Sequence, residues 1–342
     1  MVVVDIAETD EFSQLAQPYR RELLAHCYRM LGSVHEAEDL VQETYLRAWR
    51  AYDRFEGRSS LRTWLHRIAT TACLTALESR NRRPLPTGLG GPSDDPKGQL
   101  PTQPEVPWLE PVPDAMVGAD GADPAATVTS RESIRLALIA ALQYLPARQR
   151  AVLILRDVLK FKAAEVAETV GISVAAVNSL LQRARAQLEQ AGLREDEVTE
   201  PATSEQRELL ERYAAAFENY DVPAMVKLFA EDVVWEMPPF LAWFQGAETV
   251  GQMISAQCPA QGPGDQVMVA TTANGQPAFG LYMRDENGVH RAFQMHVLTL
   301  TASDVGQVTV FFDLTLFPVF GLPMTWPAES GTEQPPQRFS QF

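Results

Sequence analysis

Apolar residues in the first 83 positions recur every three or four residues, which is the spacing of one helix face. One such helix is predicted over residues 36–50 and another from a serine cap at Ser59 or Ser60 to about Ser79. In the second helix we expect an apolar buried stripe and a polar exposed side. The stripe is Leu61, Trp64, Leu65, Ile68 and Ala72, and the exposed side is Arg62, His66, Arg67 and Thr70.

The pattern stops at residue 84. Residues 84–130 contain ten prolines, many Gly, Asp and Ser residues, and no helical or strand period. Such composition predicts an extended linker over 85–130 with polyproline-like stretches and little packed structure.

Helical spacing returns over residues 131–191. We expect helices at 131–144, from Pro146 to about 158, at 163–170 and from a cap at Ser173 onwards, with Gly171 ending the third. A short helix, a glycine turn and a capped helix are typical of a helix-turn-helix, although ordinary helical hairpins look similar. The last helix should bury Val174, Val177, Leu181, Ala184 and Leu188. Its outward residues are Ser173, Ala175, Ala176, Asn178, Ser179, Gln182, Arg183 and Arg185, which suit either a DNA groove or plain solvent.

After an acidic linker at 192–203 the pattern changes to helices followed by strands. Helices are predicted at 204–219, 222–230 and 247–257, and strands at 233–238, 266–273, 277–284, 291–300 and 307–314. The sequence Asp-Glu-Asn-Gly at 285–288 is a hairpin turn signal. Helices segregated from an antiparallel meander indicate an α+β domain over 204–325, and residues 326–342 look like a disordered tail.

The formal net charge of the chain is −15, but the basic and acidic side chains are concentrated in different segments. Residues 58–83 carry six arginines and one acid, and residues 131–194 carry ten basic and five acidic side chains. Residues 86–130 have a net charge of −6 and residues 195–342 of −14. Two basic islands in an acidic chain fit contact with a phosphate backbone, or two solvated helical faces.

Three scattered cysteines do not form a disulfide framework or a four-ligand zinc site, and they fit a reducing, cytoplasmic location. The first residues do not resemble a signal or transit peptide, and no window suggests a membrane span. No spacing indicates a metal site, a phosphate loop or a cofactor.

Two stretches together resemble the sigma-70 family of bacterial transcription factors, in its extracytoplasmic function group. Residues 37–84, beginning AEDLVQETYLRAW, are similar to region two, and residues 145–188, beginning LPARQRAVLILRD, are similar to region four. They occur in the family's order, with no region three between them. The resemblance implies all-α domains over 11–84 and 131–191 that bind core RNA polymerase and promoter DNA.

The resemblance also implies roles for individual residues. The helix with the sequence DLVQE would bind the clamp of the polymerase β′ subunit, and region four would meet the β flap. The clamp-binding residues would be Asp39, Leu40, Gln42, Glu43 and Arg47. The minus-ten element would be captured and held by Phe55, Arg58, Ser59, Arg62, His66, Arg67, Arg80, Arg82 and Arg83.

The outward face of the helix at 173–186 would read the minus-thirty-five element. Many relatives have a basic residue where this chain has Asn178, so the promoter sequence it prefers stays open. In the family the linker runs toward the active-site channel, and the acidic character of residues 86–130 fits that position, as it would any soluble linker.

Residues 204–320 resemble the SnoaL-like, nuclear-transport-factor-two-like fold, a curved sheet and helices that form a cone. The closing stretch LFPVFGLP at 316–323 looks like the end of some sigma factors fused to such a domain. The fold includes small-molecule isomerases, cyclases and hydrolases as well as non-catalytic binders. His296 and Asp313 lie on neighbouring predicted strands, and Glu236 and Arg284 could join them. A His–Asp pair in an aromatic cone could do acid–base chemistry, but aromatic residues on strands usually build core. The candidate pocket residues are Trp235, Trp243, Tyr282, His296 and Asp313.

The sequence therefore favours a non-enzymatic sigma factor whose acidic C-terminal domain regulates it, through a ligand or an intramolecular contact. The alternative is a bifunctional protein with a catalytic C-terminal domain.

Overall fold

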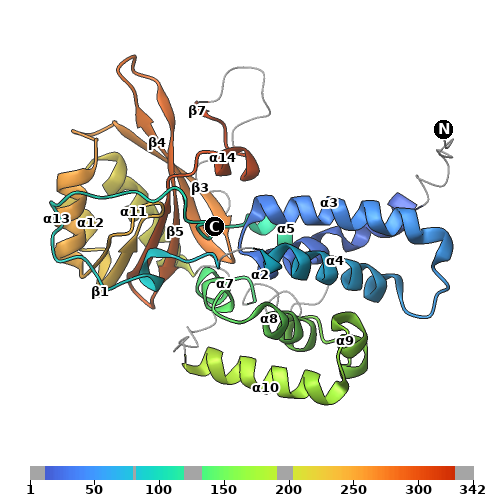
Figure 1. Ribbon diagram of the computed structural model, residues 1–342. Coiled ribbons are helices and arrows are strands. Elements are labelled where there is room, and N and C mark those ends of the chain that lie inside the picture. The colour runs from blue at the N-terminus through green and yellow to red at the C-terminus, as the bar shows by residue number, and fades with distance from the viewer. Residues whose placement is uncertain (1–11, 80–81, 119–132, 191–202, 328–342) are drawn as a thin grey trace. The chain divides into compact units, whose positions relative to one another are not determined.

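The computed structural model describes residues 12–79, 82–118, 133–190 and 203–327 (Figure 1). The chain divides into two compact units, one formed by residues 1–83 and 109–196 and the other by residues 84–108 and 197–342. Arg80, the 192–202 part of the predicted second linker and the predicted tail from 328 lie outside the described residues.

The first part of the helical unit is a bundle of three long helices. They are α2 (Arg20–Leu31), α3 (Val34–Ala51) and α4 (Leu61–Glu78), with single turns η1 (Gln17–Tyr19) and η2 (Tyr52–Arg54). Ser33 and Ser60 cap α3 and α4, and each side-chain oxygen accepts a hydrogen bond from the backbone N–H three residues later. Both predicted helices are confirmed, including the serine cap of the second.

One expectation for α4 was wrong. His66 and Thr70, predicted to be exposed, are fully buried. The Thr70 hydroxyl lies 3.0 Å from Nε2 of His26 on α2, and the His66 ring meets the edge of Phe161. Because α4 packs against α2 on one side and against α8 and α9 on another, its buried surface is wider than a single apolar stripe.

The second part of the helical unit comprises α7 (Leu136–Leu142), α8 (Ala147–Leu153), a π-helical turn η4 (Ile154–Val158), α9 (Ala163–Val170) and α10 (Val174–Gln190). Gly171 takes the left-handed conformation between α9 and α10, which bend by 95°. This is the predicted helix-turn-helix. Val174 is exposed instead of buried, so the inner face of α10 is formed by Val177, Leu181 and Ala184.

Much of the predicted linker is packed, contrary to expectation. Residues 84–108, with the turn η3 (Pro86–Gly88), belong to the C-terminal unit, and residues 109–118, with α5 (Asp114–Val117), belong to the helical unit. Prolines remove backbone donors, so this segment cannot build regular structure alone. Its remaining polar groups pair with another part of the chain instead. Thr102 forms an isolated antiparallel β-bridge with Phe240. The Gln103 N–H donates to the Pro239 carbonyl at 2.9 Å, and the Ser93 N–H donates to the Trp243 carbonyl at 2.7 Å.

Besides residues 84–108, the C-terminal unit contains α11 (Ser204–Glu218) and α12 (Val222–Val226) before its first strand and α14 (Leu316–Val319) after β6. The described strands form one sheet in the order β2-β1-β6-β5-β4-β3, and β7 also pairs with β5. The antiparallel meander β3 to β6 is confirmed, while β1 and β6 are parallel. The strands are β1 (Phe229–Glu236), β2 (Trp243–Gln245), β3 (Gln266–Ala273), β4 (Gln276–Arg284), β5 (His290–Leu300), β6 (Val305–Phe311) and β7 (Thr325–Trp326).

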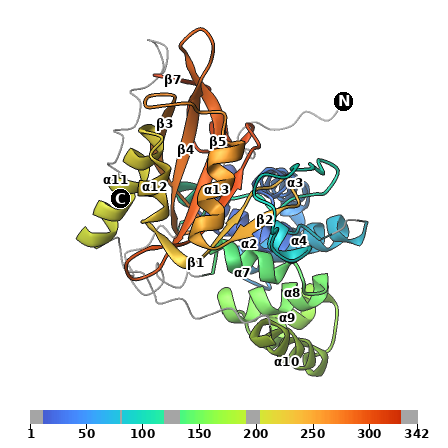
Figure 2. The same ribbon diagram turned by 90° about the vertical axis from the view of Figure 1, so that its left-hand side faces the viewer.

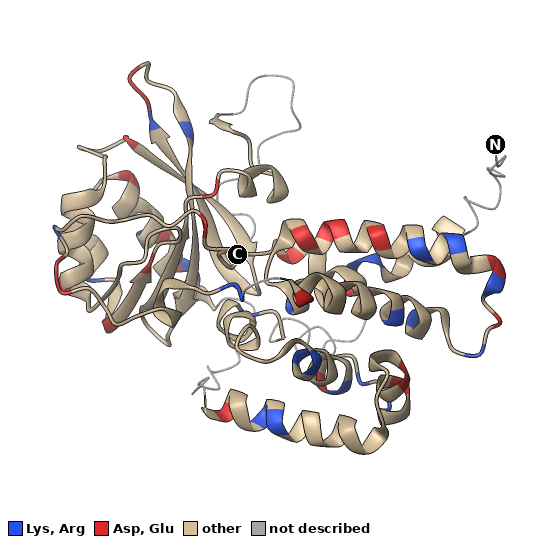
Figure 3. Cartoon of the chain, in the orientation of Figure 1, with Lys and Arg blue, Asp and Glu red and all other residues tan. Residues whose placement is uncertain are grey.

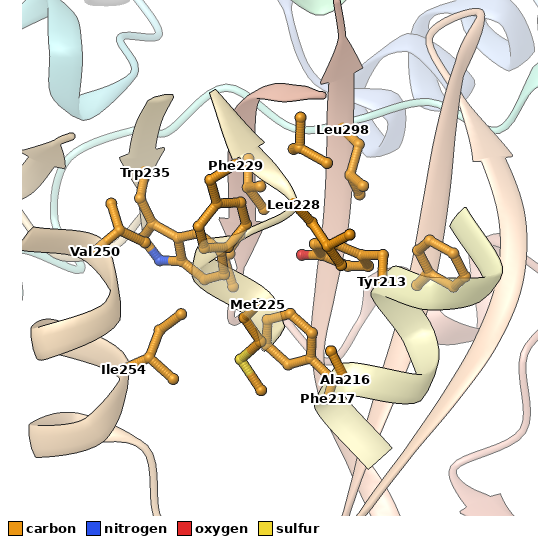
Figure 4. Packing of buried hydrophobic residues seen from close by; sticks show 14 of the residues in the cluster. Tyr213, Ala216, Phe217, Met225, Leu228, Phe229, Trp235, Val250, Ile254 and Leu298 are labelled. Carbon is orange, nitrogen blue, oxygen red and sulfur yellow. The ribbon is translucent and has the colours of Figure 1, made fainter. Parts of the chain in front are cut away.

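Helices cover one face of this sheet (Figure 2). On this face Tyr213 and Phe217 of α11 pack with Trp235 of the sheet and with buried side chains of α12 and of α13 (Ala247–Gln257) (Figure 4). The opposite face carries Tyr282, whose ring meets Phe317 of α14. The fold class is therefore the predicted one: helical domains and an α+β domain.

No single helix within the described ranges is long and apolar enough to cross a membrane, although the bent pair α9 and α10 passes that test by length and composition together.

Candidate nucleic-acid and polymerase interface

The helix α3 separates a buried side from an exposed polar side. Val41, Thr44 and Ala48 are buried, while Asp39, Gln42 and Arg47 are exposed. Leu40 and Glu43 are half-buried, and Arg47 Nη2 lies 2.5 Å from Glu43 Oε1, one helical turn earlier. The acidic residues of α3 precede its basic ones along the helix (Figure 3).

An apolar residue also stands on this exposed side. Leu46 is 54% exposed, the most of any large hydrophobic residue in the described part of the chain. It follows Gln42 by four residues and Asp39 by seven, so the three share one face. Leu46 was not among the residues predicted to contact a partner, and only its exposure in the folded bundle marks it.

The loop before α4 presents Arg58 and Ser59 to solvent. Phe55 is half-buried, and its ring lies 4.7 Å from Trp64 and 6.4 Å from Tyr52. Phe55 is thus part of an aromatic cluster with Tyr52 and Trp64 and is not fully enclosed.

The basic residues of α4 are engaged within the helical unit. Both Arg62 nitrogens Nε and Nη2 donate to the Glu22 carboxylate, and Nη2 also donates to the Leu159 carbonyl at 3.3 Å. The guanidinium stands 4.8 Å above the Phe161 ring. Arg67 Nη1 lies 2.5 Å from Glu168 Oε1 on α9.

Beyond α4 the two described arginines differ. Arg82 is exposed and lies 4.5 Å from the Tyr144 ring. The Arg83 side chain is only 13% exposed, with Glu36 at 2.7 Å and Glu110 at 3.7 Å. Arg83 thus holds the end of α4 to α3 and to the packed segment at 109–118.

The outward residues of α10 lie where the pattern put them. All eight are exposed except Ala176, which is half-buried. Ser173 caps the helix by accepting from the Ala176 N–H at 3.2 Å. Arg185 makes two hydrogen bonds to the Asp157 carboxylate, at 2.9 and 2.7 Å, and so anchors α10 to the turn before α9.

The five predicted pocket residues of the C-terminal domain do not converge. Trp235 and His296 lie on the helix-covered face, whereas Tyr282 lies on the other face. Trp243 Nε1 donates to the Gly90 carbonyl at 2.9 Å. Asp313 is exposed and accepts hydrogen bonds from Thr315. The His–Asp pair expected from neighbouring strands is therefore not formed.

His296 is part of the core. The Gln294 amide donates to Nε2 at 2.7 Å, and Nδ1 lies 2.8 Å from the Tyr213 hydroxyl. The rings of Phe217 and Trp235 meet the imidazole edge-on. Complete burial lowers the pKa of His296 to about 3, so the ring is neutral at ordinary pH.

Glu236 and Arg284, the two possible partners of that pair, lie elsewhere. Arg284 pairs with Asp265. Glu236 is fully buried on the opposite face from His296 and accepts hydrogen bonds from Gln307 at 2.9 Å and Thr309 at 3.0 Å. Thr87 donates to it twice, from its hydroxyl at 2.9 Å and its N–H at 3.2 Å. Burial raises the pKa of Glu236, and these donors oppose the shift.

A surface cleft of about 680 Å³ in this unit lies between residues 92–94 and the start of α13, with Asp94, Glu231 and Asp232 among the residues that line it. Among the described residues no group of three His, Cys, Asp or Glu side chains could hold a metal ion.

Comparison with known proteins adds to this geometry. Residues 15–83 match Sigma-70 region 2, residues 135–188 match Sigma-70 region 4 and residues 210–310 match the SnoaL-like domain. The chain is 59% identical over 314 residues to the ECF RNA polymerase sigma factor SigG of Mycobacterium tuberculosis, covering 92% of this chain and 84% of that protein. The chain belongs to the ECF RNA polymerase sigma factors. This confirms the family expected from its sequence.

A second relative of this sigma factor also matches over most of its length. SigJ of Mycobacterium tuberculosis is 30% identical over 321 residues, covering 90% of this chain and 91% of that protein. The crystal structure of SigJ superposes with a TM-score of 0.58 at 25% identity and covers 91% of this chain and 99% of that one. The match extends over both units of this sigma factor.

Proposed function

We propose that the chain binds core RNA polymerase and directs it to promoters to initiate transcription. One observation carries the proposal: α3 and α10 each bury an apolar side and leave a polar side free for a partner. The family to which the chain belongs supports the same function.

In this proposal α3 binds the β′ clamp through Asp39, Gln42 and Glu43, with Arg47 beside them. Leu46 lies on the same face, one helical turn after Gln42, and would supply an apolar contact of the kind that polar side chains surround at many protein interfaces. Polar groups fix the register of the complex, and an apolar centre excludes water from it.

The two DNA-binding surfaces are assigned by the same reasoning. The loop with Arg58 and Ser59, beside Phe55, would hold an unstacked base of the minus-ten element. The small residues Ala175 and Ala176 allow α10 to approach the major groove of the minus-thirty-five element. Asn178, Gln182 and Arg183 then reach base edges or phosphates.

For the C-terminal domain we propose a regulatory role without catalysis. Support comes from the packing, because His296 is held inside a filled aromatic core and Asp313 lies elsewhere. An acid–base pair needs both groups within reach of one substrate atom. The phosphodiester chemistry then belongs to the polymerase.

Charge reversal on α3 tests the proposal. Asp39→Arg should weaken core polymerase binding by about tenfold or more, because a like charge replaces a complementary one at an interface. Binding is measured by titrating labelled full-length protein with core polymerase, and initiation by run-off transcription on a fragmented genomic template pool. Glu78→Arg makes the same charge change at an exposed position of α4 and serves as the control. Equal affinity of both variants and the unchanged protein, or no specific starts from the unchanged protein, would contradict the proposal.

A further inference from the structure

The end of α3 carries two exposed arginines that the interfaces described above do not use. Arg50 lies in the last turn of α3 and Arg54 in the turn η2 that follows, so the two lie about one turn apart on the same side. Neither guanidinium forms a hydrogen bond or an ion pair with a described residue. We propose that Arg50 and Arg54 bind phosphates of the unpaired promoter strand, next to the base held by the loop at 55–60. This inference rests on the proposed function.

Elsewhere in the described helical unit, arginines commonly pair with a carboxylate. Those that do so are Arg20, Arg47, Arg58, Arg62, Arg67, Arg83 and Arg185. Arg50 and Arg54 differ, because two like charges four residues apart on a helix repel one another. The negative end of the α3 dipole favours positive charge at this place, but it does not occupy the guanidinium donors. Those donors are therefore free to hold an external anion in the way that guanidinium groups hold phosphates.

An aromatic cluster adjoins these arginines. Phe55 follows Arg54 directly, and the centroid of its ring lies 4.7 Å from that of Trp64 and 6.4 Å from that of Tyr52, which stands between Arg50 and Arg54 in the chain. All three rings are only half-buried. Sites for single-stranded nucleic acids combine basic side chains that follow the backbone with aromatic rings on which bases stack. The bases of a duplex stack on one another instead, so this arrangement favours an unpaired strand.

The acidic side chains nearby leave this basic surface available. Asp53 precedes Arg54, but adjacent residues of a helical turn do not face one another. Glu56 lies 3.1 Å from Nε of Arg58, and the two side chains are 67% and 86% exposed. An ion pair so exposed is weak and is screened by salt, so a phosphate can displace Glu56. Arg50, Arg54 and Arg58 then form a basic line from the end of α3 into the loop.

Core polymerase is the other macromolecule that meets α3 in the proposed function. Arg50 follows Leu46 by four residues and shares its face. The acidic residues assigned to the clamp come earlier on the helix, whereas its basic residues lie toward the end that leads into the loop (Figure 3). Arg54 adjoins the aromatic cluster and stands four residues before Arg58. The observations therefore favour DNA over the polymerase for this pair.

The test compares two double variants of the full-length protein. Arg50→Gln with Arg54→Gln removes the proposed site, and Arg207→Gln with Arg212→Gln removes the same charge from exposed positions of α11 as the control. The probe is an oligothymidylate of about 12 nucleotides, titrated over a range of salt concentrations. We expect the first variant to bind it about tenfold more weakly than the control, because charge-assisted hydrogen bonds are lost. Its slope of log K against log salt should be shallower by about 1.4, the value for two phosphate contacts on a single strand.

Core polymerase titration of the same two variants separates the possible partners, and we expect equal affinity for the polymerase in both. Equal affinity and slope for oligothymidylate in the two variants would overturn the inference, as would a lack of oligothymidylate binding by the unchanged protein. Weaker polymerase binding by the Arg50 and Arg54 variant alone, with oligothymidylate binding unchanged, would assign the pair to the clamp and also overturn the inference.

The proposed function is decided by different measurements, namely the polymerase affinity of Asp39→Arg and run-off transcription by the unchanged protein. Each of the three results that overturn the inference leaves those two measurements as they are. Conversely, a lack of specific starts together with the expected change in salt slope would overturn the proposed function and keep a single-strand site at Arg50 and Arg54.

Discussion

At the scale of single residues, burial decides what a polar side chain does in this protein. His66 and His296 are both fully buried, and burial lowers the pKa of His66 to about 4 and that of His296 to about 3. Glu236 is also buried, but it accepts four hydrogen bonds and joins residue 87 to β1 and β6. These groups act through position and hydrogen bonding, because none of them meets solvent.

The pKa of His296 predicts how the C-terminal unit responds to acid. A histidine whose pKa is depressed on folding takes up its proton mainly in the unfolded chain, so stability falls as the pH drops below about 6.5. From pH 7 to pH 5 the loss should be about 2 kcal/mol. Urea denaturation at both pH values measures it. His296→Gln keeps a hydrogen-bonding side chain that does not titrate, and it should remove most of the difference. A difference of the same size in that variant would contradict the assignment.

At the scale of elements, amphipathic helices present one side to the protein and the other to partners. In α10 the division follows the helical period closely: Val177, Leu181 and Ala184 are buried, and the intervening residues are outside. In α4 four neighbouring helices, α2, α3, α8 and α9, reduce the exposed side. The spacing of apolar residues therefore predicts the exposed side well for a helix with few neighbouring elements and less well for a helix with many.

The exposed apolar residue of α3 gives a prediction for that helix. Leu46→Ala should weaken binding to core polymerase by about 1 kcal/mol or more, as expected for an apolar residue at the centre of an interface. It should change the free energy of unfolding by less than about 0.5 kcal/mol, because the side chain already meets water. Polymerase titration and thermal unfolding measure the two effects. Leu314→Ala, at an exposed leucine of the C-terminal unit, is the control. Unchanged polymerase binding would remove Leu46 from the interface.

At the scale of the whole molecule, the chain between the two DNA-binding parts is shared by the two compact units. Residues 84–108 pack in the C-terminal unit and residues 109–118 in the helical unit. On the helical side, Glu110 accepts hydrogen bonds from Ser33 and His35. The segment at 84–108 thus packs with a domain that follows it by about a hundred residues, which suits a regulatory role for that domain.

Truncation after residue 196 tests this sharing of the segment. Hydrogen exchange should accelerate at the amides of Ser93 and Gln103, whose acceptors are carbonyls of the removed unit. The amide of Glu110, which donates to the Gly32 carbonyl at 2.9 Å, should exchange as before. Glu110 is the control within the same chain. Equal protection of Ser93 and Gln103 in the truncated and full-length proteins would show that the segment holds its structure without the C-terminal domain.

Much of the fold follows from local signals in the sequence. Serine caps, Gly171 and the strand alternation of the meander are properties of neighbouring residues, and the corresponding elements formed as predicted. Where the prediction was wrong or incomplete, the partner was distant: His26 and Phe161 for His66, Phe317 for Tyr282, and Pro239 for Gln103. The spacing of apolar residues shows which side of a helix or strand is apolar, but it does not show how many other elements pack against that helix or strand.

The sequence by itself therefore determined the family and the order of its regions through their motifs, and most of the outward residues of α3 and α10 through the spacing within each helix. The tertiary structure alone decided which candidate residues meet. It put His296 and Tyr282 on opposite faces of a sheet, buried Glu236 against Thr87 and paired Arg67 with Glu168. The physical reason is that such contacts join residues far apart in the chain, and their formation depends on how whole elements pack.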